Sequence, residues 1–402
     1  MRGRGEGSVY KRAVDGLWCA TVELPPLDGK RRKKVVTSKS KAEVLVKMAA
    51  VKRELERAGD LPTASQTLET WLTYWLEKVA AKRVRPNVLA SYRSLINRRI
   101  IPVIGKVRLD KLTSAHVLRM HDRMTEEGLS STYALGAYRV LSKALEDAVR
   151  AGRVGRNVAK LTDAPRRAAT KLETLTRDEA IQLVSRAVPA LLETPYDPTP
   201  VRHAAYVLTA FRRGEMLGLE TDRITLPKGP DDFGSIDLSW QLQRIAQRDV
   251  DAARADFELR QLKGGLYLTR PKSRAGWRVI PLVEPLASLL RDHLARMVVN
   301  EYGLVWATPD GEPIEPRREW DLWRATLEAM GIDRHVRTHD LRHTAVDLLY
   351  EAGVPEDLVV EIVGHSTRSM TRAYKSGSQT RKIVALQQFS ELLAPTPRGT
   401  AS

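Results

Sequence analysis

The sequence predicts a multidomain protein that is mainly α-helical, with small β-sheets. Its 402 residues exceed what a single hydrophobic core usually holds, so two or three domains are expected. Apolar residues repeat with the period of an α-helix along most of the chain, whereas β-leaning runs gather near the N-terminus and inside the C-terminal half. These shifts predict domains over residues 1–58, 64–160 and 172–393, followed by a disordered tail over residues 394–402.

A strong positive charge narrows the class of partner. The formal net charge is +17 and the isoelectric point is near 10.0. Such a balance favours binding to a polyanion, and nucleic acid is the commonest polyanion partner. The alternative is a basic surface that only aids solubility.

Cysteine usage and hydropathy favour a cytoplasmic protein without a membrane partner. The single cysteine, Cys19, excludes an internal disulfide and a cysteine-based zinc site, and it fits a reducing compartment. No apolar run is long enough to span a bilayer, and residues 1–5 lack the apolar core of a signal peptide. The sequence shows no glycine-rich phosphate loop, so nothing in it indicates use of ATP.

The first domain is predicted to be a three-stranded sheet followed by a helix. Asp15-Gly16 favours a tight hairpin, because glycine tolerates positive φ. The helix is expected from Ser40 to Arg57, with one apolar stripe. The expected strands are Ser8–Arg12, Leu17–Glu23 and Lys33–Thr37.

A run of basic residues, Lys30 to Lys34, is expected at the second turn of this sheet. A β-ribbon edged with lysine and arginine can enter a DNA major groove. The alternative is a solvated loop. The candidate DNA contacts here are Arg31, Arg32, Lys33 and Lys34.

The second domain is predicted to be all-helical. Four helices are expected, because each of four segments has an apolar stripe at helical spacing. A break in the chain is expected at Pro102–Gly105. A basic face on the second helix is expected to be open to solvent, with Arg93, Arg98 and Arg99 as candidate DNA contacts. The four helices are expected to begin at Thr67, at Pro86, at Ser114, and at Ser130 or Ser131.

The third domain is predicted to mix helices with a few strands. Thr176–Glu179 is a capping box that opens its first helix. The final helix, Arg381–Leu393, has an apolar stripe that must be buried on its own domain or on a neighbouring protomer. Further helices are expected over Val201–Ala210, Leu286–Val299, Arg318–Met330, Leu341–Ala352 and Pro355–Val363.

Three strands are expected in this domain, over Ser235–Ser239, Leu266–Thr269 and Arg278–Leu282. Residues 271–276 are predicted to join the last two as a polar hairpin. The charged segment Gln241–Gly264 reads as a helical or disordered insertion, and its sequence does not indicate a role.

Six residues of the third domain suit phosphodiester chemistry. Two guanidinium groups can hold the non-bridging oxygens of a phosphate and neutralise charge in its transition state. A tyrosine is a weak nucleophile that needs a neighbouring base or cationic field, and the leaving sugar oxygen needs a proton from a lysine or histidine. The six residues, in chain order, are Arg212, Lys272, His339, Arg342, His365 and Tyr374.

Each of these residues taken alone has an ordinary structural interpretation. Arg212 could be a surface or capping arginine, Lys272 an exposed hairpin lysine, and Tyr374 a core aromatic. The four-residue spacing of His335, His339 and His343 could also be taken for a metal stripe. We reject a metal site, because His335 is expected to precede the helix, Thr338 is expected to be its N-cap, and no carboxylate or cysteine completes a ligand set.

The order and spacing of these residues resemble the tyrosine recombinase (phage integrase) family. The likeness covers most of the chain. The insertion Gln241–Gly264, Lys375-Ser376 after the tyrosine, and Asn157-Val158 in place of the usual Asn-Pro depart from the family pattern. The matching motifs are Ala210–Glu215 with Leu217 and Leu219, Pro271–Ser273 followed by Arg278–Leu282, His339–Thr344, Val363–Ser366, and Tyr374 nine residues after His365.

The resemblance implies an enzyme that cleaves and rejoins DNA through a 3′-phosphotyrosyl bond. Tyr374 would be the nucleophile and Lys272 the general acid, with Glu215 as a supporting carboxylate. Arg212 and Arg342 would hold the phosphate, His365 would donate a further hydrogen bond, and His339 would assist proton movement at the nucleophile. No metal, ATP or other cofactor is implied.

The resemblance also implies a domain plan and partners. The three domains resemble an arm-site-binding domain, a core-site-binding domain and a mixed α+β catalytic domain. Four protomers would act on two duplexes through a Holliday junction, with the C-terminal helix docking on a neighbour. A bacterial host and association with the nucleoid are expected, for a phage or another mobile element. The sequence leaves open whether a DNA-bending protein or a directionality factor takes part.

Two other functions use the same features. One is a topoisomerase of the type IB kind, which would use the same chemistry to relax DNA. The other is a sequence-specific DNA-binding protein whose catalytic domain has lost its activity; the presence of all six groups argues against it.

Overall fold

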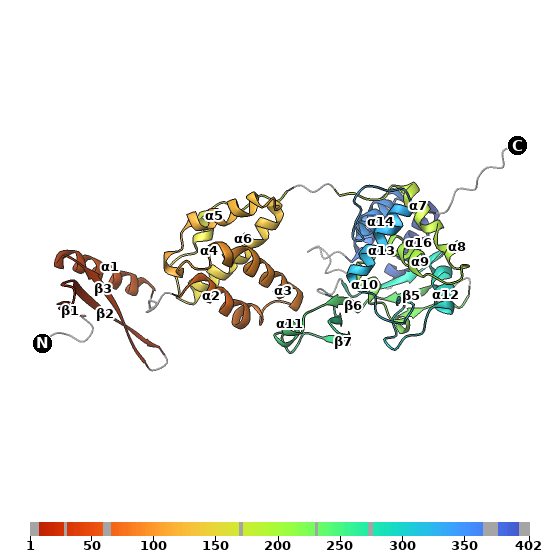
Figure 1. Ribbon diagram of the computed structural model, residues 1–402. Helices are drawn as coiled ribbons and strands as arrows, with labels where there is room; N and C mark the ends of the chain where they lie inside the picture. Colours follow the sequence, from red (N-terminus) through yellow and green to blue (C-terminus); the bar gives the residue numbers. More distant parts are fainter. Residues whose placement is uncertain are drawn as a thin grey trace. The chain divides into compact units, whose positions relative to one another are not determined.

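The computed structural model describes residues 8–27, 30–58, 66–168, 172–229, 232–271, 276–364 and 377–393. The chain divides into two compact units, residues 1–169 with 248–254 and residues 170–247 with 255–402 (Figure 1). Both are rich in helices, and the sheets are small and antiparallel, which confirms the predicted fold class. No helix in the described part of the chain is long and apolar enough to cross a membrane.

The N-terminal part of the first unit is the predicted three-stranded sheet with its helix. The strands β1 (Ser8–Lys11), β2 (Trp18–Leu27) and β3 (Lys30–Ser38) pair in the order β1-β2-β3. Gly16 in the first turn has φ 68°, as the hairpin signal requires. Helix α1 (Lys41–Ala58) packs its apolar stripe on β2 and β3, and the core is formed by Val22, Leu24 and Val51 with Val36, Met48 and Leu55.

The basic run lies within β3 and is not confined to a turn, which corrects the sequence expectation. Lys33 pairs with Glu23, and Lys34 pairs with Val22. Strand pairing continues through the run because β2 extends to Leu27 and offers backbone partners there. Side chains alternate along a strand, so Arg31 and Lys33 are exposed whereas Arg32 and Lys34 are half-buried.

The predicted helical domain makes up the rest of residues 66–168. Trp71 donates its indole N–H to the carbonyl of Ala144 at 3.0 Å, and Trp75 donates to the Asp147 carboxylate at 2.8 Å. Both rings are buried, so these bonds fix α2 and the π-helical turn that follows it against α6. The helices are α2 (Leu68–Tyr74), α3 (Pro86–Leu95), α4 (Ile101–Ile104), α5 (Ser114–Glu126) and α6 (Ser131–Arg150), with π-helical turns over Trp75–Ala80 and Ile96–Ile100.

The expected break over Pro102–Gly105 does not begin at Pro102, because the helix ends only at Gly105. The chain continues from α3 through the π-helical turn Ile96–Ile100 into α4, which begins at Ile101. Pro102 therefore lies in the first turn of α4, where its missing N–H costs nothing. The wider π turn before it accommodates the ring without ending the helix.

Residues 248–254 group with the first unit, although the sequence places them within the range 172–393. Asp249 of the short helix α11 (Gln247–Asp251) is buried and accepts from the Arg93 guanidinium at 3.1 Å. Arg93 is therefore half-buried and ion-paired, so the expectation that its whole face is open to solvent is wrong.

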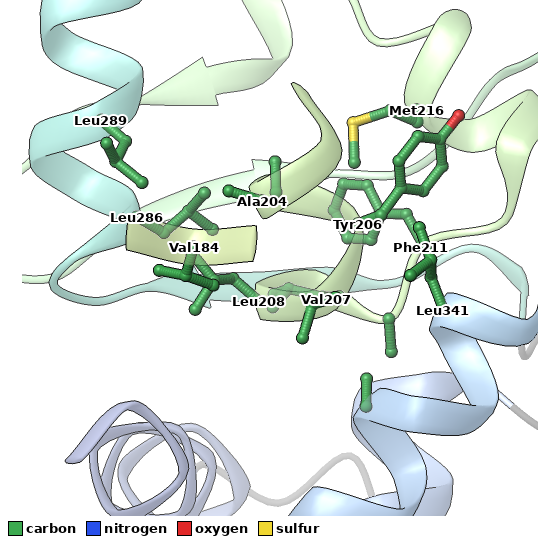
Figure 2. Close-up of a cluster of buried hydrophobic side chains, with 14 of the residues drawn as sticks. Val184, Ala204, Tyr206, Val207, Leu208, Phe211, Met216, Leu286, Leu289 and Leu341 are labelled. Atoms are coloured by element: carbon green, nitrogen blue, oxygen red, sulfur yellow. The ribbon is translucent and has the colours of Figure 1, made fainter. Parts of the chain in front are cut away.

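The second unit is built around helix α9 (Thr199–Thr209), most of whose residues are buried. Figure 2 shows side chains of α9, among them Ala204, Tyr206 and Val207, in one apolar cluster with Phe211, Met216 and Leu341. The helices packed against α9 are α7 (Arg177–Ser185), α8 (Ala187–Ala190), α10 (Arg213–Leu217), α12 (Leu286–Arg296), α13 (Pro316–Ala329) and α14 (Asp340–Glu351).

The second unit holds two three-stranded sheets, with orders β4-β5-β9 and β6-β8-β7. The predicted hairpin between the last two expected strands is wrong, because β8 and β9 belong to different sheets. β8 is already paired on both edges by β6 and β7, so it has no edge left for β9. The strands are β4 (Ile224–Thr225), β5 (Gly234–Asp237), β6 (Gln241–Arg244), β7 (Leu259–Lys263), β8 (Leu266–Thr269) and β9 (Val279–Leu282).

The expectation that the segment Gln241–Gly264 is a helical or disordered insertion is wrong. The segment supplies β6, β7 and the short helix α11. Pairing with the buried strand β8 outweighs the high charge of the segment, because the ladder is set by backbone groups that composition does not reveal.

The final helix, α16 (Gly377–Leu392), buries its apolar stripe on its own domain. Leu386, Phe389 and Leu393 are buried, and α16 lies against β9, α14 and α15 (Glu356–Val363). Of the two alternatives left open by the sequence, the single chain adopts the intramolecular one. Docking of this stripe on a neighbour would first require its release.

Candidate active site

The junction of α9 and α10 positions Arg212. Ala210 ends α9 in the left-handed conformation, with φ 54°, and the chain then turns so that Arg212 caps α10. The Arg212 N–H donates to the Glu215 carboxylate at 2.9 Å, and its guanidinium donates to the same group at 2.6 Å. Glu215 is only 1% exposed, so Arg212 is held on a fixed, buried carboxylate.

Arg342 reaches the same junction from α14. It is 2% exposed and donates one N–H to the carbonyl of Ala210 at 2.7 Å and another to the carbonyl of Val363 at 2.5 Å. A guanidinium has five N–H donors, and among the described residues only two of those of Arg342 are assigned. Arg342 is thus held by carbonyls of both the α9–α10 junction and the end of α15.

A third arginine, Arg278, completes the cluster, although it was expected only as the first residue of a strand. It precedes β9, is 7% exposed, and donates to both Glu215 oxygens at 3.2 and 3.0 Å. The available signal was a charged residue at the start of an apolar strand. Alternation along that strand points its side chain inward with Ile280.

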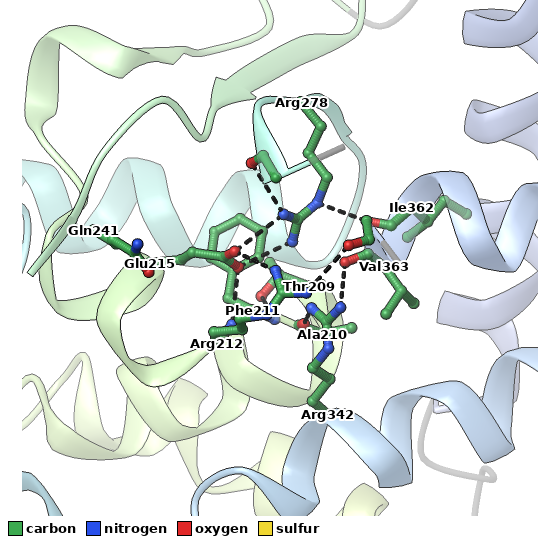
Figure 3. Close-up of polar contacts among 12 residues, drawn as sticks. Thr209, Ala210, Phe211, Arg212, Glu215, Gln241, Arg278, Arg342, Ile362 and Val363 are labelled. Atoms are coloured by element: carbon green, nitrogen blue, oxygen red, sulfur yellow. Dashed lines mark hydrogen bonds and ion pairs between the residues drawn. The ribbon is translucent and has the colours of Figure 1, made fainter. Parts of the chain in front are cut away.

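The C-terminal end of α15 is the common anchor of the three arginines (Figure 3). Gly364 follows this helix with φ 72°, the usual conformation of a helix C-cap glycine. A helix end carries unpaired carbonyls and partial negative charge, which cations satisfy. Three successive carbonyls accept from different arginines: Ile362 from Arg278 at 2.9 Å, Val363 from Arg342 at 2.5 Å, and Gly364 from Arg212 at 3.1 Å.

The charges in this cluster do not balance. Burial by itself would raise the pKa of Glu215, but the charges of Arg278 and Arg212 outweigh it and lower that pKa to about 2. Burial, followed by the charges of Arg212 and Arg278, lowers the pKa of Arg342 to about 9, so Arg342 is still cationic at neutral pH. Three guanidinium groups thus share one carboxylate, and an anion such as a phosphate would relieve the excess positive charge.

His339 lies beside the cluster at the start of α14. The helix begins at Asp340 with His339 in the cap position, so the expectation that Thr338 is the N-cap is wrong. The Asp340 carboxylate accepts the Arg337 N–H at 2.8 Å and so closes the turn before the helix. Desolvation, followed by the charges of His343 and Arg342, lowers the pKa of His339, which favours a neutral ring that can accept a proton.

A cavity of about 420 Å³ opens at His339. The His339 and His343 rings meet edge to face, with their centres 5.4 Å apart. The centres of the His335 and Trp320 rings are 5.3 Å apart. Within the described residues, no group of three or more His, Cys, Asp or Glu side chains is placed to hold a metal ion. The cavity is lined by Arg213, Trp320, His335, Arg337, Thr338 and His339.

The structure brings together Arg212, Glu215 and Arg342 of the predicted site, with His339 at its side. Lys272, His365 and Tyr374 lie outside the described residues, so their roles stay predictions. His365 directly follows the α15 end on which the arginines converge.

The candidate DNA contacts of the helical domain have different surroundings. Arg98 is exposed, whereas Arg99 is half-buried and donates to Glu127 at 2.6 Å. Arg99 also lies over the ring of Tyr133 at 5.6 Å. With Arg93 paired to Asp249, Arg98 is the member of this set most open to a DNA phosphate.

Comparison with known sequences places this geometry in a family. Residues 242–381 match the phage integrase family, and residues 67–124 match the phage integrase N-terminal SAM-like domain. An integrase of Saccharopolyspora erythraea is 28% identical over 419 residues, which cover 92% of this chain and 92% of that protein.

Solved structures share the fold. The Tn1549 transposon integrase in complex with a circular intermediate DNA aligns with a TM-score of 0.61 and 18% identity, over 80% of this chain and 100% of that one. A lambda integrase tetramer bound to a Holliday junction aligns with a TM-score of 0.55 and 17% identity, over 91% of this chain and 98% of that one. This chain thus carries a phage integrase catalytic domain, preceded by the SAM-like domain found at the N-terminus of phage integrases.

Proposed function

We propose that this protein is a site-specific DNA recombinase that integrates or excises a phage or another mobile element. The observation that carries the proposal is the cluster of Arg212, Arg278 and Arg342 around the buried carboxylate of Glu215. Its excess positive charge suits a phosphodiester, and its anchor, the α15 end, directly precedes the chain that carries His365 and Tyr374.

In the proposed reaction, the Tyr374 hydroxyl attacks the scissile phosphorus. The bond from phosphorus to the 5′-oxygen breaks as the bond to the tyrosine oxygen forms. His339 takes up the tyrosine proton, and Lys272 gives a proton to the leaving 5′-oxygen. Arg212 and Arg342 bind the non-bridging oxygens, with His365 as a further donor.

The second half of the reaction reverses these steps with a different 5′-hydroxyl. The phosphotyrosyl bond keeps the energy of the broken phosphodiester, so rejoining needs no ATP. The residues proposed above account for every proton transfer without a metal ion.

We propose that DNA is held by the basic residues of the first unit. Arg31 and Lys33 project from β3, and Arg98 projects from the helical domain. Arg32, Lys34, Arg93 and Arg99 are candidates of the same kind whose side chains are half-buried in the free chain. For this function we propose a homotetramer that acts on two DNA duplexes. We place it in the bacterial cytoplasm, at the nucleoid.

A topoisomerase with the same chemistry is a second candidate. The basic N-terminal sheet and the separate helical core favour recognition of defined sites instead. A footprint with one core site and flanking arm sites would support recombination, whereas protection without sequence preference would favour relaxation.

The test is covalent trapping on nicked DNA that carries the attachment site. The wild-type protein should form a protease-sensitive covalent adduct, and Tyr374→Phe should form none. Tyr350→Phe is the matched control, because Tyr350 is an exposed tyrosine of the same domain. An adduct formed by Tyr374→Phe would overturn the nucleophile, and absence of any wild-type adduct would overturn the function.

A further inference from the structure

Arg278 is bonded in a way that differs from the other two arginines of the cluster. It donates to Ile362 and to both Glu215 oxygens, and one terminal nitrogen also reaches the Gly276 carbonyl at 3.5 Å. These four contacts therefore occupy four of the five N–H donors of the Arg278 guanidinium. Because Arg278 is also 7% exposed, it has little left to offer a substrate.

The partners of Arg278 are parts that the proposed reaction needs. Glu215 holds Arg212 through its backbone and its guanidinium. Ile362 belongs to the same helix end that holds Arg212 and Arg342 through the two following carbonyls. Arg278 thus joins Glu215, which holds Arg212, to the end of α15. The next two carbonyls of that helix end orient Arg212 and Arg342.

We propose that Arg278 is a positioning residue for DNA strand cleavage. It fixes Glu215 against the C-terminal end of α15, so that Arg212 and Arg342 are already oriented when the phosphate arrives. This inference rests on the proposed function and adds to it a residue that never touches DNA.

The geometry requires an arginine at this position. A planar guanidinium meets both carboxylate oxygens side by side and still points Nε at the Ile362 carbonyl. It also lies 5.9 Å from the centre of the Phe211 ring. A lysine would supply the charge but only one point of contact, so Glu215 and the α15 end would no longer be held together.

The experiment compares Arg278→Gln and Arg278→Lys with wild type in single-turnover adduct formation. We expect the Arg278→Gln rate to fall roughly 100-fold, as displacement of catalytic groups by about 1 Å does. Arg278→Lys should fold like wild type, but its rate of adduct formation should be at least about 10-fold below the wild-type rate. The affinity for uncleaved DNA should change less than about 3-fold for both variants, because Arg278 makes no substrate contact.

Three further variants, Arg223→Gln, Glu215→Gln and the Arg278→Gln/Glu215→Gln double variant, separate positioning from general damage. Arg223→Gln is the matched control, because Arg223 pairs with Asp237 at 3.1 Å in the same unit but does not touch Glu215. Its cleavage rate should match wild type. If Arg278 acts through Glu215, the Arg278→Gln/Glu215→Gln double variant should be no slower than the slower single variant.

The proposal fails if Arg278→Lys cleaves at the wild-type rate, or if the two single losses multiply in the double variant. It also fails if both Arg278 variants lose DNA binding in proportion to cleavage. Thermal melting curves show whether Arg278→Gln folds. If it does not fold, the cleavage rate of Arg278→Lys tests the proposal. Failure of wild type to form adducts would instead refute the proposed function.

Discussion

Arg212 and Arg213 are adjacent in the sequence but have different surroundings. Arg212 is bound to the buried Glu215, whereas Arg213 is exposed and, among the described residues, donates to the Pro316 carbonyl at 3.4 Å. The turn at Ala210 decides which of the two faces the cluster, because it sets where α10 begins. The resemblance to the family selected Arg212, and local sequence signals alone would not have done so.

A pair of lysine substitutions tests this distinction. Arg212→Lys should slow covalent adduct formation by about 100- to 1,000-fold, because a lysine cannot hold both Glu215 and a phosphate oxygen. Arg213→Lys should cleave within about 2-fold of wild type. Adduct formation on nicked DNA measures both, and equal rates for the two variants would show that Arg212 does not act on the phosphate.

At the scale of elements, the C-terminal end of α15 organises the site. Its three carbonyls orient three arginines that come from the α9–α10 junction, the start of β9 and α14. Gly364 keeps this end open with φ 72°. Gly353, directly after the C-cap of α14, also has a positive φ, 75°, but among the described residues no arginine of the cluster donates to its carbonyl.

The two glycines offer a matched comparison. Changing either to alanine should lower the free energy of unfolding by about 1 kcal/mol, because L-residues disfavour positive φ. Only Gly364→Ala should also slow cleavage, by about 10-fold or more, because shifting the carbonyls misplaces Arg212 and Arg342. Urea unfolding and adduct formation measure the two effects, and a similar loss of cleavage in Gly353→Ala would contradict a special role for α15.

At the scale of the molecule, a buried neutral histidine, His293, makes the free energy of unfolding depend on pH. His293 accepts the Tyr196 hydroxyl at 2.7 Å, donates to the Val305 carbonyl at 2.8 Å, and stacks on Trp306. Burial is the main cause that lowers the pKa of His293 to about 4. Between about pH 6.5, where unfolded histidine titrates, and pH 4, only the unfolded chain binds this proton.

Stability should therefore be full above about pH 6.5 and fall as the pH drops toward 4, by up to about 3 kcal/mol from His293. His293→Gln should flatten this part of the profile, and His335→Gln, at an exposed position, should leave it unchanged. Urea unfolding at pH 7 and pH 5 measures the difference. An unchanged pH profile in His293→Gln would show that the ring is not kept neutral by the fold.

Local patterns predicted the local structure well. The capping box at Thr176 forms as expected, with the Thr176 N–H bound to the Glu179 carboxylate at 2.7 Å, and Gly16 makes the first hairpin. The helices of the third domain begin and end within a few residues of their predicted limits. These features depend on contacts within one or two turns of chain, which is the range that periodicity and capping signals report.

The sequence alone determined most of the helices, the strands of the first domain, the basic character and, through its motifs, the resemblance to the family. Tertiary structure decided which strands pair. As a result, β8 and β9 lie in different sheets, and the charged insertion supplies β6 and β7. It also decided that Arg278 belongs to the site, since its partners lie 63 residues away at Glu215 and 84 residues away at Ile362. Strand pairing and buried ion pairs depend on which distant segments meet in space, and no pattern within a few residues encodes that.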